Sequence, residues 1–180
     1  MPKCCINLDI SNERSVGHSE FSRLALRAPP GSDGLVLLPY FEKASNLERL
    51  RASGVPHGLT EANATPAYIA RAAVEGVLCN LAGSLEALMQ HGARPERLLL
   101  VGGAARSEAV RQIAPTVFSQ PVVILGSEKL GAYGAARQAA WTVTATLEAP
   151  AWRTAAQMLY GEAIPSIRTR YADARSRMLI

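Results

Sequence analysis

The stretch Leu98–Ser107 constrains the fold of this chain more than any other stretch. Its first four residues are apolar, the pattern of a strand that is buried on both faces in a parallel sheet. The pair Gly102-Gly103 follows, and glycine permits positive φ and has no Cβ to hold a ligand away from the backbone. Ser107 is a good N-cap for a helix. A strand, a Gly-Gly turn and a helix predict a place where backbone meets a nucleotide, although many such turns contain glycine for geometry alone.

The longest predicted helix begins after the N-cap residue Thr65, with Pro66 at its first position, and ends at Gly92. Its apolar residues recur every three or four positions and form one stripe. The stripe consists of Ile69, Ala73, Val77, Leu81, Leu85 and Leu88. Glu75 could be a catalytic carboxylate, but Arg71 stands one turn earlier, which favours a structural ion pair.

The remaining elements are shorter. Helical turns are predicted over 20–26, a helix over 107–114 that Pro115 ends, and a helix over about 130–147 with many small residues in its first half. Buried strands are predicted over 35–38 and 121–125, turns over 29–34 and 126–129, and one further short strand over 5–10. Residues 40–65 read mostly as loop, and the chain after Pro150 as irregular, with one short helix near 172–178. This order predicts an α/β layer structure with a parallel pair of strands.

Composition indicates a globular chain of one medium domain. Of its 180 residues, 48% are hydrophobic and 19% are charged. No apolar run approaches the roughly 20 residues of a membrane span, and the first residues do not resemble a signal peptide. We therefore expect a cytoplasmic protein that does not contact a membrane.

The net charge of +4 is unevenly distributed, because the last 30 residues hold five arginines and only two acidic residues. Interleaved aromatic residues are almost absent there, which argues against nucleic-acid binding and favours a solvated end. The cysteines and histidines lack the spacing of metal ligands, so no metal site is predicted. These residues are Cys4, Cys5, Cys79, His18, His57 and His91.

Several motifs, in order over residues 20–145, resemble the C-terminal lobe of FGGY-family carbohydrate kinases. The sequences and the spacing of these motifs are most similar to those of bacterial xylulokinases. Gly34-Leu35-Val36-Leu37-Leu38-Pro39-Tyr40, residues 54–60 and residues 70–76 match three of them. Residues 99–107 resemble the family's adenosine motif, and residues 132–136 its closing helix.

The resemblance implies a partial actin-like ATPase (ribonuclease H-like) lobe, with helices packed on a small, mainly parallel sheet. It implies ATP and Mg²⁺ as cofactors and transfer of the γ-phosphoryl group to a sugar hydroxyl. The residues carried over to the adenosine pocket are Gly102, Gly103, Ala104, Arg106 and Ser107. The expected organisation is a poorly defined N-terminal segment (1–27), a nucleotide-binding lobe (28–148) and a basic tail (149–180).

The sequence also departs from the family pattern. The sugar-binding lobe, the first phosphate loop and the aspartate base would precede this chain, and residues 4–16 do not resemble the second phosphate loop. Residues 42–45 replace the family's Gly-Glu-Arg-Thr-Pro stretch, and Pro56 and Tyr68 occupy positions where other residue types are usual. We therefore assign no catalytic residue, and expect sugar to bind only together with the missing lobe.

Two functional hypotheses follow. The first is an ATP-binding lobe of a xylulokinase-like enzyme that is inactive alone, as a truncated product or one half of a split enzyme. The second is a non-catalytic module that docks on a kinase partner or associates with itself through exposed apolar surface and an unpaired sheet edge. A dinucleotide-binding Rossmann unit fits poorly, because the turn is not Gly-x-Gly-x-x-Gly and no P-loop is present.

Overall fold

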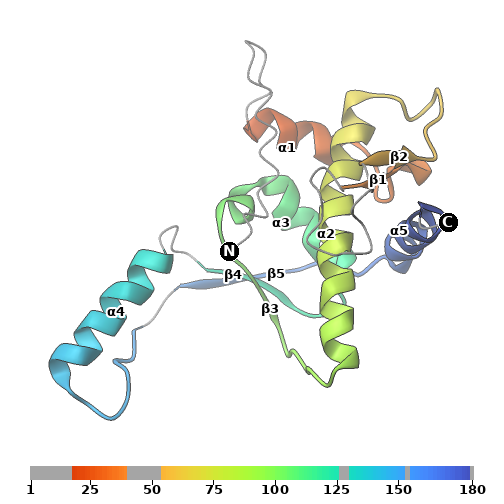
Figure 1. Cartoon of the computed structure of the whole chain (residues 1–180). Coiled ribbons are helices and arrows are strands. Elements are labelled where there is room, and N and C mark those ends of the chain that lie inside the picture. Colours follow the sequence, from red (N-terminus) through yellow and green to blue (C-terminus); the bar gives the residue numbers. More distant parts are fainter. Residues whose placement is uncertain (1–17, 40–53, 126–129, 153–154, 179–180) are drawn as a thin grey trace.

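The structure of the chain is a computed structural model that describes residues 18–39, 54–125, 130–152 and 155–178. Figure 1 shows the arrangement of its elements. Two short 3-10 helices, Ser32–Gly34 and Gly103–Arg106, accompany the longer elements. In chain order these are α1 (His18–Arg27), β1 (Val36–Leu38), β2 (Val55–His57), α2 (Pro66–Gln90), β3 (Leu98–Leu100), α3 (Glu108–Val117), β4 (Val122–Leu125), α4 (Leu130–Thr144), β5 (Ala156–Leu159) and α5 (Pro165–Met178).

Helix α2 is the centre of the molecule and packs against α1, β1, α3 and α5 (Figure 1). Its buried positions are mostly small residues, which allow neighbouring elements to approach closely. One core includes Ala25 of α1, Leu78 of α2, Ile113 of α3 and Tyr171 of α5. All three sequence segments, 1–27, 28–148 and 149–180, therefore contribute to the same core.

The strands form two small sheets. Strands β1 and β2 pair antiparallel, with Leu37 opposite Pro56. Strand β4 lies between β3, which is parallel to it, and β5, which is antiparallel to it. The parallel pair predicted from the sequence is thus confirmed, whereas β2 and β5 fall in regions where a loop and an irregular segment were predicted.

Only part of the apolar stripe of α2 faces the core, although such a pattern usually marks the buried side of a helix: Leu85 packs against the core, whereas other members of the stripe are exposed. Ile69, Leu81 and Leu88 are 49%, 41% and 60% exposed. The buried side instead holds alanines together with Leu78 and the polar pair Arg71 and Glu75. Periodicity alone shows that a helix has an apolar side, but it does not show which side the neighbouring elements cover. Here the small residues of α2 fit closely against four elements, and this packing determines the buried side.

The ends of two helices also differ from the prediction. Helix α3 continues through Pro115 to Val117. A proline near the end of a helix removes one N–H donor, and burial of Val117 and Phe118 holds this last turn in place. Helix α2 begins at Pro66 as predicted, but the Thr65 side chain makes no capping hydrogen bond in the described structure.

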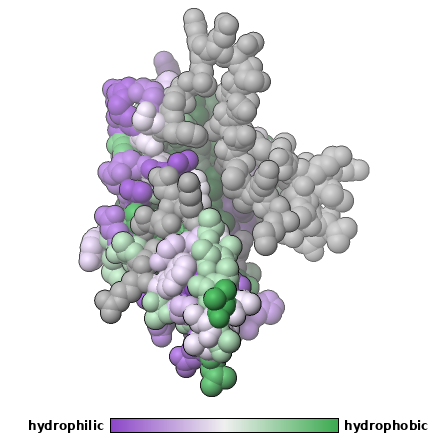
Figure 2. Space-filling view, turned by 90° about the vertical axis from the view of Figure 1, so that its left-hand side faces the viewer, coloured by the Kyte–Doolittle hydropathy of each residue, from purple (hydrophilic) through white to green (hydrophobic). Residues whose placement is uncertain are grey.

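Helix α4 projects from the rest of the molecule (Figure 1). None of its residues is buried. Figure 2 views the molecule from this side and shows mainly pale, weakly hydrophobic surface where the helix lies. Its glycines, Gly131 and Gly134, have nothing within 4 Å of an added Cβ, so no described element makes the close approach that the small residues would permit.

Helix α5 contains the short helix predicted near 172–178 but begins earlier, at Pro165, and Ile167, Tyr171 and Ala174 anchor it in the core. Four of the five arginines of the tail, Arg168, Arg170, Arg175 and Arg177, therefore lie on a packed helix. The short strand predicted over residues 5–10 and the turn over 126–129 fall outside the described residues.

Helix α2 has the length and the hydropathy of a membrane-crossing helix. The core helix of a soluble domain meets the same criterion, and α2 buries an arginine and a glutamate among four other elements. A buried ion pair and close contacts with several elements are features of a core helix, and part of the apolar surface of α2 remains exposed.

Candidate functional site

The turn after β3 is the candidate site, and its backbone is open. Gly102 has φ 93° and ψ −171°, a conformation that side-chain-bearing residues rarely adopt. A Cβ added to Gly102 or to Gly103 would meet nothing within 4 Å. Space for a ligand therefore lies directly against the backbone of both residues.

A 3-10 turn and a capped helix give this segment its shape. The Ala105 N–H donates to the Gly102 carbonyl at 3.2 Å, and the Ser107 N–H to the Ala104 carbonyl at 3.1 Å. The Ser107 hydroxyl caps α3 by accepting from the Val110 N–H at 3.4 Å, which confirms the predicted N-cap.

Two side chains fasten the turn to the body of the molecule. The hydroxyl oxygens of Ser107 and Ser22 lie 2.9 Å apart in a hydrogen bond that ties the turn to α1. The Arg111 Nε donates to the Ala105 carbonyl at 2.7 Å. The hydroxyl of Ser107 is therefore occupied in holding the turn, whereas the backbone of Gly102 and Gly103 faces open space.

The five residues predicted for the adenosine pocket all lie within one turn of six residues, 102–107. Gly102, Gly103, Ala104 and Arg106 are exposed, and Ser107 is half-buried. The preceding strand, however, is not buried on both faces as predicted. Its residue Leu99 is 48% exposed, and Val101, which follows the strand, is 57% exposed.

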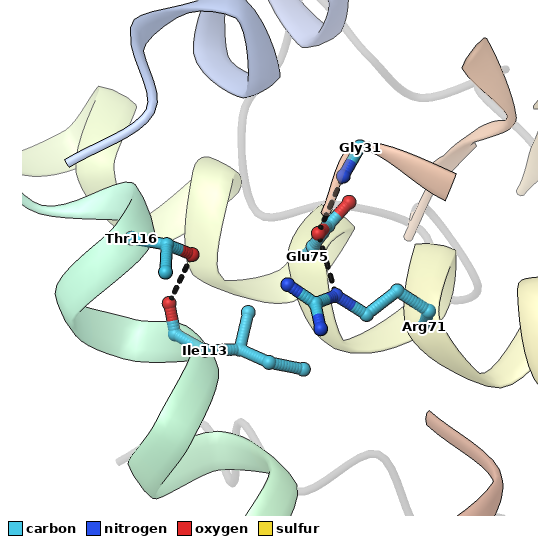
Figure 3. A network of polar contacts seen from close by, with 5 residues as sticks. All are labelled: Gly31, Arg71, Glu75, Ile113 and Thr116. Atoms are coloured by element: carbon cyan, nitrogen blue, oxygen red, sulfur yellow. Dashed lines mark hydrogen bonds and ion pairs between the residues drawn. The ribbon is translucent and has the colours of Figure 1, made fainter. Parts of the chain in front are cut away.

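Glu75 belongs to a buried polar network at some distance along the chain from this turn. Figure 3 shows its carboxylate between Arg71 and Gly31. One oxygen, Oε1, accepts from the Arg71 Nε at 2.7 Å and from the Gly31 N–H at 2.9 Å. The structural interpretation of this carboxylate is thus confirmed, because both contacts lie inside the protein.

Asn63 is a second buried polar residue that holds a turn in place, and it was not predicted from the sequence. It is fully buried; its Oδ1 accepts from the Thr60 N–H at 2.7 Å and its Nδ2 donates to the Gly58 carbonyl at 2.9 Å. Nδ2 also lies 3.3 Å from the Asp33 carbonyl. The Thr-x-x-Asn spacing signals a local turn, but the contact with residue 33 leaves no trace in the sequence.

The described residues hold no group of three or more histidine, cysteine, aspartate or glutamate side chains that could bind a metal ion. Any divalent cation at the turn would therefore depend on other ligands, such as the phosphates of a bound nucleotide.

Comparison with known proteins gives the wider context. The sequence profile of the FGGY family of carbohydrate kinases, C-terminal domain, matches residues 7–143. A xylulose kinase of Haemophilus influenzae is 32% identical over 145 residues, which are 77% of this chain and 29% of that protein. A xylulose kinase of Streptomyces coelicolor is 33% identical over 157 residues, 85% of this chain and 32% of that protein.

A solved structure shows the same relationship. The crystal structure of xylulose kinase from Bifidobacterium adolescentis superposes with a TM-score of 0.74 at 39% identity and covers 88% of this chain and 31% of that one. The chain therefore spans about a third of the length of the relatives it matches.

Proposed function

Because this chain belongs to the FGGY family of carbohydrate kinases, we propose that it forms the ATP-binding part of a xylulose kinase. The fold is the α/β architecture of the actin-like sugar kinases, with helices packed on a small mixed sheet. The observation that carries the proposal is the open backbone at Gly102 and Gly103, which follows a strand that pairs in parallel with β4.

Each residue of the turn has a distinct proposed role. Gly102 and Gly103 contact the adenosine directly, since no side chain separates a ligand from their backbone. Ala104 and Arg106 border the same space, and both are exposed. Ser107 shapes the turn through its bonds to Val110 and Ser22 rather than by contacting the ligand.

Phosphoryl transfer needs the nucleotide to be positioned, its charge to be neutralised and a base to take the hydroxyl proton. We assign the first task to this chain. Magnesium, when bound with ATP, supplies the charge neutralisation. We propose that the sugar site and the base belong to the part of the relatives that this chain does not span, and that the protein acts in the cytoplasm.

A titration with Mg-ATP followed by amide NMR tests the nucleotide proposal. An open site on one part of the enzyme encloses little of its ligand, so we expect weak binding. The dissociation constant should be on the order of 1 mM, which corresponds to a binding free energy of about −4 kcal/mol. The amides of Gly102, Gly103 and Ala104 should shift most. Gly103→Val should abolish the shifts, whereas Gly134→Val on α4 should leave them. Shifts elsewhere, or none, would contradict the proposal.

We also propose that residues 1–180 alone do not phosphorylate xylulose. The measurement is ADP release in the presence of xylulose and Mg-ATP, with a full-length relative such as the Haemophilus influenzae xylulose kinase as the positive control. Xylulose-dependent turnover by this chain, purified from a host that lacks xylulose kinase, would overturn this statement.

A second candidate function, an interaction module, is favoured by specific exposed surface. The stripe of α2 presents Ile69, Leu81 and Leu88, and β3 has a strand partner on one side only among the described residues. The sheet face away from the core adds Leu99 and Met158. Exposed apolar surface beside an open sheet edge is typical of a docking surface.

Sedimentation velocity over a range of concentrations tests this second function. We expect reversible self-association that Leu81→Lys together with Leu88→Lys weakens. Lysine substitutions at Ala135 and Gln138 on α4, both also exposed, serve as the matched control. A monomer at every concentration would exclude self-association through these surfaces.

A further inference from the structure

A groove separate from the Gly102–Ser107 turn lies between α2, α5 and the end of α3. It encloses a volume of about 320 Å³ and shares no lining residue with the turn. Helix α2 contributes Cys79, Gly83 and Glu86 to its wall, and α5 contributes Arg168 and Arg175. Figure 1 shows α5 beside α2, and the two helices are in contact.

The charges in the groove do not balance. Arg168 forms an ion pair with Glu86. Arg175 pairs with no carboxylate among the described residues. Among the described lining residues, two guanidinium groups therefore face one carboxylate, which leaves one excess positive charge.

The position of Arg175 depends on Gly83. An atom placed at the Cβ of Gly83 would lie 3.3 Å from Nη1 of Arg175. The guanidinium thus lies close over α2, where a side chain at position 83 would crowd it. This placement directs a planar five-donor group along the groove wall, and such a fork binds carboxylate or phosphate with two parallel hydrogen bonds.

The rest of the lining suits the uncharged body of a small ligand. Val117, Ile164 and Pro165 are apolar and line the groove. Burial and, to a lesser degree, the charge of Glu75 raise the pKa of the Cys79 thiol to about 12, so this residue adds no negative charge at neutral pH. The volume lies at the small end of ligand pockets, roughly 300–1,000 Å³.

We propose that this groove binds a small organic oxyanion, a carboxylate or a phosphomonoester, through Arg175 and Arg168, with the ligand's body against the apolar wall. The proposal does not rest on nucleotide binding, because the two sites share no residue. The carboxylate and the phosphomonoester have the same recognition chemistry, and separate probes distinguish them.

The test is an amide NMR titration of the full chain with glycerol 3-phosphate, with 4-hydroxybutyrate, and with glycerol as the neutral control. We expect saturable shifts at Gly83, Ala172 and Arg175 with at least one of the two anions and none with glycerol. Arg175→Gln should weaken binding about tenfold, since it removes a charge-assisted pair. Arg177→Gln, on the same helix but outside the groove lining, should not.

Glu86→Gln supplies an independent readout. It releases Arg168 from its ion pair with Glu86, so the affinity for the anion should rise. If Arg168 only stabilised the fold, this variant would not increase the affinity. If Arg175→Gln does not fold, this variant alone decides the matter. The proposal is overturned if neither anion gives saturable shifts in the groove, if Arg175→Gln binds as the wild type does, or if Glu86→Gln leaves the affinity unchanged or lower.

Discussion

Glu75 shows how one residue can connect distant segments of this chain. Its carboxylate oxygen Oε1 accepts from Arg71, one turn earlier on α2, and from the backbone of Gly31, which lies 44 residues away. Both charged side chains are almost fully buried. Desolvation offsets much of the attraction in such a pair, so its net contribution to stability is small, but loss of one partner leaves the other as an uncompensated buried charge.

Glu75→Gln should therefore lower the free energy of unfolding by about 3 kcal/mol, because Arg71 keeps its charge and loses its counterion. Urea denaturation followed by circular dichroism measures the change. Glu20→Gln is the matched control: its pair with Arg23 also lies within one helix but is exposed to solvent, so the loss of stability should be much smaller than for Glu75→Gln. Equal losses in the two variants would contradict the argument.

Cys79 makes stability depend on pH in the alkaline range. Burial raises the pKa of its thiol from 9.0 to about 12. Above pH 9 the unfolded chain loses this proton while the folded chain keeps it, so the folded state is progressively disfavoured. The free energy of unfolding should fall by up to about 1.4 kcal/mol per pH unit from this group alone.

The expected result is that Cys79→Ala flattens the decline of the free energy of unfolding between pH 9 and pH 12 relative to the wild type. Urea titrations at several pH values measure both slopes, and the other titrating groups cancel in the comparison. Parallel slopes would show that the thiol titrates normally in the folded chain.

At the scale of elements, α2 and β1 approach each other very closely at Gly76. A Cβ on Gly76 would lie 2.1 Å from the carbonyl oxygen of Leu37, which is backbone and cannot move aside. Gly76→Ala should therefore destabilise the protein by roughly 1–3 kcal/mol through overpacking.

Gly134 of α4 gives the opposite expectation for the same substitution. It also lies inside a helix, but nothing is within 4 Å of its Cβ position. Gly134→Ala should favour the helical conformation of α4 by about 1 kcal/mol, since alanine has the higher helix propensity. Thermal unfolding of the Gly76→Ala and Gly134→Ala variants measures both changes in stability. A loss of stability with Gly134→Ala would indicate that another part of the protein contacts α4 at this position.

Local signals in the sequence predicted many of these elements, and long-range contacts account for those it missed. Helices α1, α2 and α4 and strands β1, β3 and β4 have their own periodicity, caps or apolar runs. Strand β2 contains a proline and exists because β1 pairs with it. Helix α5 is rich in arginine, and its few apolar residues become a core face only once α2 is present.

The candidate sites divide in the same way. The turn from Gly102 to Ser107 is contiguous, so its glycines and its cap were visible in the sequence. The groove beneath Arg175 was not, because Gly83 and Glu86 lie far away along the chain. The direction of the α2 stripe could not be predicted either, since it depends on which neighbours pack against the alanines.

At the scale of the whole molecule, the structure divides into a packed body around α2 and a projecting helix. The helix α4 buries no residue, whereas α2 buries nine. Local opening costs least where few buried contacts must break. Amide protons of α4 should therefore exchange with solvent much faster than those of α2, as hydrogen–deuterium exchange mass spectrometry can measure. Comparable protection of both helices would show that α4 is covered in solution.

The return of the chain after α4 has a practical consequence. Leu125, the last residue of β4, is the register partner of Ala156, the first residue of β5. The polypeptide thus leaves the sheet and comes back at adjacent positions, and two antiparallel strands can be joined by as few as two residues. The segment between these two residues can therefore be replaced by a tight turn, or by a fluorescent reporter protein whose termini lie close together. Either replacement should keep the pairing of β4 with β5.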